Sequence, residues 1–136
     1  MASRLKTKRP PVRLIDTEAE RLTDIALNAS GPAKQAGELL LDEIARASIC
    51  RADQAPGDII TMHSMIEFED AASGASRTVQ LVYPGEADIS KGRISILTPV
   101  GAGLIGLSAG DVILWPDRDG RERPLAILKV TQPPRS

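Results

Sequence analysis

Residues 101–106 place three glycines at the spacing of a dinucleotide-binding loop, Gly-x-Gly-x-x-Gly. In such a loop the glycines let the backbone approach a pyrophosphate at the N-terminus of the following helix. That site also needs a full helix after the loop and an acidic residue about 20 positions further on. Here only Leu107 and Ser108 separate the last glycine from a turn signal at 109–111. The glycines are therefore interpreted as positions of tight packing and turns, and no nucleotide site is predicted.

The other reactive side chains form no recognisable catalytic or metal-binding motif. His63, the only histidine, falls on the outward face of a predicted strand without cysteines or paired carboxylates around it. Cys50, the only cysteine, has no base partner in the sequence pattern and behaves as a small apolar residue. Asp117 and Asp119 suggest a turn, because the later glutamate of a calcium loop is missing. We expect no enzyme activity, no cofactor and no metal ion.

Composition indicates a globular protein of the cytoplasm. The chain has 136 residues with a net charge of −1, so its bulk charge does not favour a nucleic-acid partner. Aromatic residues make up 2% of the chain, and the core must therefore be aliphatic. A single cysteine fits a reducing compartment, and no apolar run approaches the ~20 residues that span a bilayer. The basic residues 1–13 have no apolar run behind them, so they predict a flexible tail and no secretory signal.

Residues 14–52 predict an antiparallel helical hairpin, a short coiled coil. Thr17 and Glu20 have the spacing of a capping box at the start of the first helix. The second helix is predicted from Ala33 to about Arg51, after a turn at 30–32. Each helix carries one apolar stripe, and the stripes must face each other: Leu22, Ile25, Ala26 and Ala29 in the first, Ala36, Leu40, Ile44 and Ala47 in the second.

Residues 57–132 predict a mostly antiparallel β-sheet with one short helix, which makes the chain an α+β protein. Alternating apolar residues favour strands over 60–69, 79–83 and 94–96, and a last strand over 125–130. The apolar run 112–115 predicts a strand that is buried on both faces or nearly so.

The segment YPGEADISKGRISILTPVGAGLIGLSAGDVI resembles the C-terminal domain of the GreA/GreB transcript-cleavage factors. That family has a Pro-x-Glu-Ala-Asp loop, then Ser/Thr-Pro-hydrophobic-Gly, and then Gly-Asp. Gly103 falls where the family commonly has Ala or Arg, which makes the dinucleotide-like spacing an accident of one residue. The upstream segments PGDIITMHSMIEFED and TVQLVYP resemble a narrower branch, the regulators of nucleoside diphosphate kinase. The resemblance covers about residues 12–131.

The resemblance implies a C-terminal domain similar to FK506-binding prolyl isomerases that docks on RNA polymerase at the rim of its secondary channel. It also implies that two segments line the docking surface: Asp88, Ile89 and Ser90, and Thr98, Pro99, Val100 and Gly101. The alternative interpretation is that these loops only pack against and close the end of the sheet.

The hairpin tip differs from that of the cleavage factors, whose tip carboxylates help to hold a catalytic Mg²⁺. Residues 28–37 contain no carboxylate, and their exposed point is predicted at Ser30, Gly31, Pro32 and Lys34. Asp24 and Glu38 flank the tip about one turn away and are interpreted as solvated helix-face charges. The hairpin is also much shorter than that of the Gre factors.

We therefore expect a non-catalytic transcription regulator that binds RNA polymerase, contacts nucleic acid only through it, takes no small ligand and competes with Gre factors. A peptide-binding or prolyl isomerase module is the alternative, although this chain has only Phe68, Tyr83 and Trp115 to line a proline pocket. A third interpretation is an adaptor that affects nucleoside diphosphate kinase levels, for which the sequence shows no docking feature.

Overall fold

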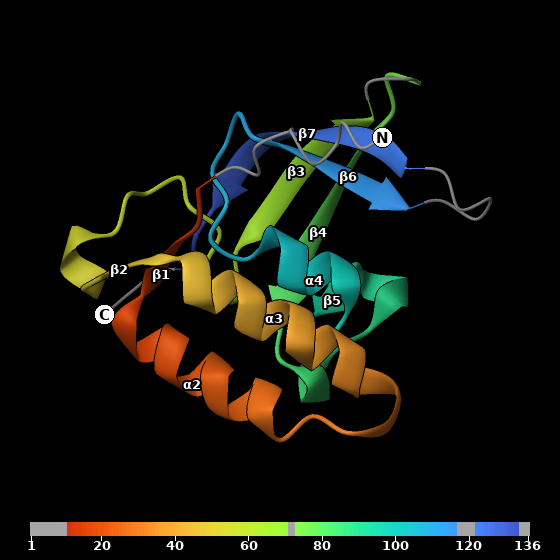
Figure 1. The fold of residues 1–136 in the computed structure, drawn as a ribbon. Helices are drawn as coiled ribbons and strands as arrows, with labels where there is room; N and C mark the ends of the chain where they lie inside the picture. Colours follow the sequence, from red (N-terminus) through yellow and green to blue (C-terminus); the bar gives the residue numbers. More distant parts are fainter. Residues whose placement is uncertain (1–10, 71–72, 117–121, 134–136) are drawn as a thin grey trace, which may run out of the picture.

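A pair of helices packs beside a five-stranded sheet in the computed structural model, which describes residues 11–70, 73–116 and 122–133 (Figure 1). The N-terminal part contains β1 (Arg13–Ile15), α2 (Asp16–Leu27), the 3₁₀ turn η1 (Gly31–Ala33), α3 (Lys34–Arg46), β2 (Ser48–Cys50) and η2 (Ala52–Gln54). The rest contains β3 (Met65–Asp70), β4 (Ser76–Val82), η3 (Pro84–Glu86), η4 (Ile89–Lys91), β5 (Arg93–Ser95), α4 (Pro99–Leu104), β6 (Val112–Pro116) and β7 (Glu122–Thr131). The predicted α+β class with an N-terminal helix pair is confirmed.

The two helices of the hairpin approach each other closely because a glycine lies between them. A Cβ on the buried Gly37 of α3 would lie 2.8 Å from the carbonyl oxygen of Ala26 and 2.9 Å from the Cβ of Ala29. The connection turns at Gly31, whose φ of 59° suits glycine, and Pro32 follows in the first turn of η1. The short turn and the close glycine contact together keep α2 and α3 antiparallel.

Both outer ends of the hairpin differ from the sequence prediction. Val12 is buried and Arg13 begins β1, so a tail that runs to residue 13 is too long; residues 1–10 lie outside the described chain. The second helix is predicted to run to about Arg51, but in the structure it ends at Arg46. Residues 48–50 instead form β2, which pairs in parallel with β1. This pairing extends the backbone up to Ile15, so α2 begins at Asp16. Thr17 therefore lies inside the helix and the predicted capping box does not form.

The five-stranded sheet has the strand order β5-β4-β3-β7-β6. β3 pairs antiparallel with β4 and β7, and β6 pairs antiparallel with β7. β5 joins β4 in parallel, so the sheet is mixed and not wholly antiparallel. The apolar run at β6 is less buried than predicted, because β6 is an edge strand and Val112 is 49% exposed. The side chain of Trp115 lies outside the described part of the chain.

The predicted strand over 60–69 begins only at Met65, because a tight turn precedes it. The Oγ of Ser64 accepts a hydrogen bond from the backbone N–H of Thr61 at 2.9 Å, and His63 has a φ of 69°. The inward half of the predicted alternation is confirmed, since the residues expected to face inward are all buried: Ile60, Met62, Ser64, Ile66 and Phe68. Thr61, which was expected to face outward, is also buried.

One apolar core joins the helix pair to the sheet. Leu22 and Leu40 of the hairpin belong to the same buried cluster as Phe68 of the sheet and Leu104 of α4. In Figure 1, α3 lies between α2 and α4, which agrees with the contacts that α3 makes with both helices. The hairpin therefore lies along the sheet domain and does not stand away from it.

The three glycines of the dinucleotide-like spacing have separate structural roles. A Cβ on Gly101 would collide with the carbonyl oxygen of Ser95 and lie 2.9 Å from the Cα of Ile96. Gly106 has a φ of 81°, and a Cβ there would collide with Val12 and lie 2.9 Å from the carbonyl oxygen of Arg13. Gly103, between them, faces open space. Two of the three glycines are thus needed for close backbone packing.

We expect Gly106→Ala to lower the free energy of unfolding by about 2 to 4 kcal/mol, because it adds left-handed strain to overpacking. Gly101→Ala should lower it by about 1 to 3 kcal/mol through overpacking alone. Gly103 lies on α4 with Gly101 but faces open space, so Gly103→Ala is the matched control. It should leave the free energy of unfolding unchanged or raise it by up to about 1 kcal/mol. Urea unfolding measures all three; a Gly106→Ala protein as stable as wild type would contradict this account of the loop.

Candidate functional site

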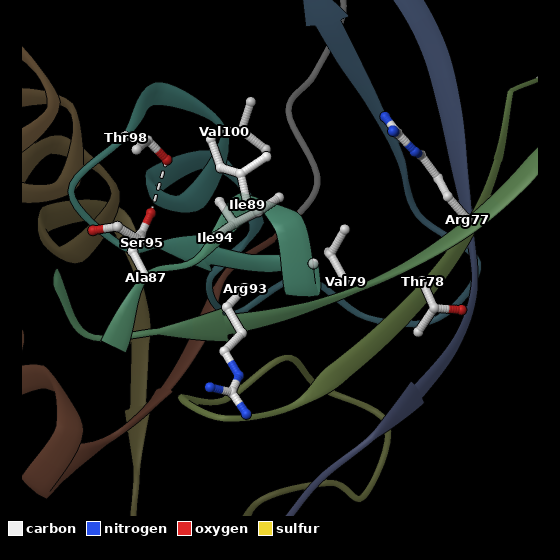
Figure 2. A pocket seen from close by; sticks show the side chains of 11 residues that line it. Arg77, Thr78, Val79, Ala87, Ile89, Arg93, Ile94, Ser95, Thr98 and Val100 are labelled. Atoms are coloured by element: carbon white, nitrogen blue, oxygen red, sulfur yellow. Dashed lines mark hydrogen bonds between the residues drawn. The ribbon is translucent and has the colours of Figure 1, made fainter. Parts of the chain in front are cut away.

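An apolar groove of about 500 Å³ lies between one edge of the sheet and the start of α4. Four aliphatic side chains from four different elements form its apolar part: Val79 of β4, Ile89 of η4, Ile94 of β5 and Val100 of α4. Figure 2 shows these four side chains gathered together, with Arg77 further along β4. The remaining lining residues are Thr78, Ala87, Gly92, Arg93, Ser95 and Thr98.

The loop that carries Ile89 is held by its two polar neighbours. The Oδ1 of Asp88 accepts hydrogen bonds from the backbone N–H of Ser90 at 3.1 Å and from its Oγ at 2.6 Å, which caps η4. The backbones of Asp88 and Arg93 also exchange hydrogen bonds of 3.0 and 2.9 Å. The loop therefore presents Ile89 to solvent, and this side chain is 89% exposed. An exposed isoleucine on a rigid loop suits contact with another apolar surface.

The turn on the other side of the groove is built around Thr98. Its Oγ1 donates to the carbonyl oxygen of Ser95 at 2.8 Å and accepts from the backbone N–H of Gly101 at 3.0 Å. Pro99 then occupies the first turn of α4, where its missing N–H costs nothing. These contacts fix the start of α4 and thereby place the side chain of Val100 at the edge of the groove.

A second hollow of about 330 Å³ separates the hairpin tip from the same turn. Its walls are Pro32, Ala33, Gln35 and Ala36 from the hairpin and Leu97, Thr98 and Pro99 from the sheet domain. Thr98 borders both hollows. The end of the hairpin therefore lies beside the turn, and the two hollows flank residues 98–100.

The residues that were predicted as site residues fall into four groups in the structure. Ile89, Thr98 and Val100 line the groove, and Pro32 and Pro99 line the second hollow. Asp88 and Ser90 hold the η4 loop, and the buried Gly101 packs against the β5 end. Ser30, Gly31 and Lys34 are exposed at the tip and line neither hollow.

Most of the groove lining was not predicted from the sequence, and Arg77, Val79 and Ile94 are the missed residues that matter most for its charge and its apolar part. The alternation in the second strand did assign Val79 to an apolar face. The parallel pairing of Leu81 with Ile94, which brings β5 beside β4, carries no local sequence signal. The groove therefore depends on a long-range pairing.

A polar cluster on the surface connects α2 to the sheet domain. The Nε2 of His63 and the Oε1 of Glu86 are 2.7 Å apart, and the His63 ring meets the Tyr83 ring edge-on at 5.6 Å between centroids. The guanidinium carbon of Arg21 lies 5.8 Å from the centroid of the same tyrosine ring. The hydrogen bond with His63 lowers the pKa of the Glu86 carboxyl, and burial raises the pKa of the Tyr83 phenol.

Within the described ranges, no three histidine, cysteine or acidic side chains gather where they could hold a metal ion. Over the same ranges, no helix is both long and apolar enough to cross a membrane.

The chain belongs to the GreA/GreB family of transcription elongation factors. Residues 55–132, more than half of the chain, match the family model "Transcription elongation factor, GreA/GreB, C-term". The chain is 32% identical to the regulator of nucleoside diphosphate kinase of Escherichia coli K12 over 126 residues, which cover 93% of both chains. It is 31% identical to the transcription elongation factor GreA of Nitratidesulfovibrio vulgaris, covering 87% of this chain and 79% of that one.

A solved structure has the same arrangement. The prokaryotic transcription elongation factor GreA/GreB from Nitrosomonas europaea superposes with a TM-score of 0.77 at 35% identity, covering 90% of this chain and 99% of that chain. The resemblance that the sequence motifs carry is thus confirmed over nearly the whole chain.

We expect Thr98→Ala to lower the free energy of unfolding by about 1 kcal/mol, because the first turn of α4 loses its cap. Thr98→Ser keeps the hydroxyl and should retain most of that stability. Urea unfolding of both variants checks the prediction. Equal stability of the alanine variant and the wild type would show that the hydroxyl does not hold the turn.

We expect Glu86 to titrate below the ordinary range of glutamate in the folded protein, since its pKa is lowered. The His63–Glu86 pair is then present at neutral pH and is lost as the pH falls through that lowered pKa. His63→Asn tolerates the left-handed backbone but removes the partner, so the pKa of Glu86 should rise toward its ordinary value. Side-chain carboxyl NMR measures this, with carboxylates far from His63 as the internal control.

Proposed function

We propose that the protein is a non-catalytic transcription regulator that binds RNA polymerase near the secondary channel and does not stimulate transcript cleavage. Membership of the GreA/GreB family supports polymerase as the partner. The observation that carries the proposal is the groove beside Ile89 and Val100, an exposed apolar surface formed by the loops whose sequence matches the family motif. The cytoplasm, where polymerase acts, is the expected location.

The hairpin supports binding without cleavage. The 12-residue helix α2 is about 18 Å long, and the turn that follows it, with the start of α3, lies beside residues 98 and 99 of the sheet domain. Residues 28–37 offer no carboxylate, and Mg²⁺ is usually held through one or two of them. A hairpin that reaches no further than its own domain would cover the entrance of a channel without supplying a metal ligand inside it. Competition with Gre factors for the same site follows.

The groove does not favour the prolyl isomerase alternative. The described residues that line it include no aromatic side chain that would hold a proline ring. Phe68 is buried in the core, and Tyr83 belongs to the polar cluster with His63. The name of the Escherichia coli relative connects that protein with nucleoside diphosphate kinase. No feature of the groove or of the hairpin indicates a kinase partner for this chain.

Binding to purified core RNA polymerase tests the proposal. We expect wild type to bind and Ile89→Asp to bind at least about tenfold more weakly, because a carboxylate would be desolvated against an apolar partner. Ile89 is 89% exposed, so the variant should fold normally. Ile49→Asp is the matched control, since Ile49 is 50% exposed on β2 and does not line the groove. Equal affinities of wild type and Ile89→Asp would reject the groove as the docking surface.

A cleavage assay on backtracked complexes completes the test. The protein should give no cleavage above background and should reduce the cleavage that an added Gre factor stimulates. A double variant with tip carboxylates, Ser30→Asp and Lys34→Glu, should also remain inactive because the hairpin is short. Cleavage by the double variant would show that the tip reaches the active site and lacks only the chemistry.

A further inference from the structure

The charge around the groove has one sign. Among the described residues, its lining includes two arginines, Arg77 and Arg93, and no acidic residue. The two carboxylates nearest to it in the sequence are engaged by their own neighbours: Asp88 accepts from Ser90, and Glu86 lies 2.7 Å from His63. Glu86 also interacts electrostatically with Arg93. In the part of the chain that the structure describes, however, neither carboxylate forms an ion pair with Arg77 or Arg93.

Arg77 is the cation best placed to meet a partner. Figure 2 shows its side chain extending from β4 on the same side as the apolar side chains, whereas Arg93 points away from them. Arg77 is exposed, and within the described ranges it makes no ion pair or side-chain hydrogen bond. A guanidinium beside an apolar surface, with all its donors free, matches a carboxylate in two-point geometry.

The lining also indicates which class of macromolecule fits. Single-stranded nucleic acid is bound on aromatic platforms on which bases stack. None of the lining residues that the structure describes is aromatic. Branched aliphatic residues dominate instead: Val79, Ile89, Ile94 and Val100. Such a surface packs against the apolar side chains of a protein segment, with a charged contact at its rim.

We propose that the occupant of the groove is an acidic amphipathic protein segment, which places an aliphatic side chain against Ile89 and Val100 and a carboxylate on Arg77. This inference rests on the proposed function and names the chemistry of the polymerase surface that the groove receives. The apolar contact holds the segment, and the ion pair at the rim sets its register and speeds the encounter.

The experiment measures the affinity of core RNA polymerase for Arg77→Gln and Arg77→Glu at low and at physiological salt. Arg77→Glu should bind about tenfold more weakly at low salt, and Arg77→Gln should lie between it and wild type. The difference should shrink as salt screens the pair. Arg51→Glu is the matched control, because it makes the same change of net charge at an exposed residue outside the groove lining and should bind like wild type.

The other outcomes separate this inference from the proposed function. If Ile89→Asp loses affinity while Arg77→Glu binds like wild type at both salt concentrations, the groove docks polymerase but its partner segment is not acidic. If wild type does not bind polymerase, both proposals fail. If the isolated protein binds a single-stranded RNA and Arg77→Glu abolishes that binding, Arg77 is a phosphate ligand and the inference is overturned. Thermal unfolding of each variant controls for folding.

Discussion

The arrangement of this molecule depends on a short backbone junction at Gly106. Its carbonyl oxygen accepts a hydrogen bond from the N–H of Arg13 at 3.0 Å, and its N–H donates to the carbonyl oxygen of Ile60 at 2.9 Å. Ile60 in turn donates to the carbonyl oxygen of Leu107 at 2.7 Å. The start of the hairpin and the approach to the sheet are thus both hydrogen-bonded to residues 106 and 107. Only a residue without a Cβ fits there, given the left-handed backbone and the contact with Val12.

This junction explains why the helix pair lies along the sheet domain. β1 and β2 pair in parallel at the base of both helices, and β1 is bonded to the junction, so the hairpin has a fixed starting direction. Leu22 and Leu40 then bury against the common core, and Arg21 packs near Tyr83 on the surface. A hairpin held at its base, its flank and beside residues 98 and 99 has little freedom to swing outward. Its short length and its fixed orientation together keep its tip beside residues 98 and 99.

The sequence predicts the parts of this fold that depend on local periodicity. The apolar stripe through Leu22 and Ala26, the glycine–proline turn at 31–32 and the alternation from Ile60 to Phe68 all correspond to buried or turning residues. The errors arise where distant segments meet. Residues 48–50 have a helical pattern but form a strand, because residues 13–15 pair with them. Thr17 matches a capping box that the same pairing shifts into the helix. Arg77 could not be assigned to a site before β5 was placed beside β4.

The family motif and the candidate contact surface are related but not identical. Asp88, Ser90 and Gly101 belong to the motif, yet their contacts are internal: two cap and hold the η4 loop, and one packs against Ser95. Ile89 and Val100 are the motif residues that bring the larger apolar side chains to the groove, which Ala87 and Thr98 of the motif also line. The motif residues therefore mainly stabilise the conformations of the two loops. If the groove docks a partner as we propose, the choice of partner depends on side chains outside the motif, among which Arg77 carries the free charge.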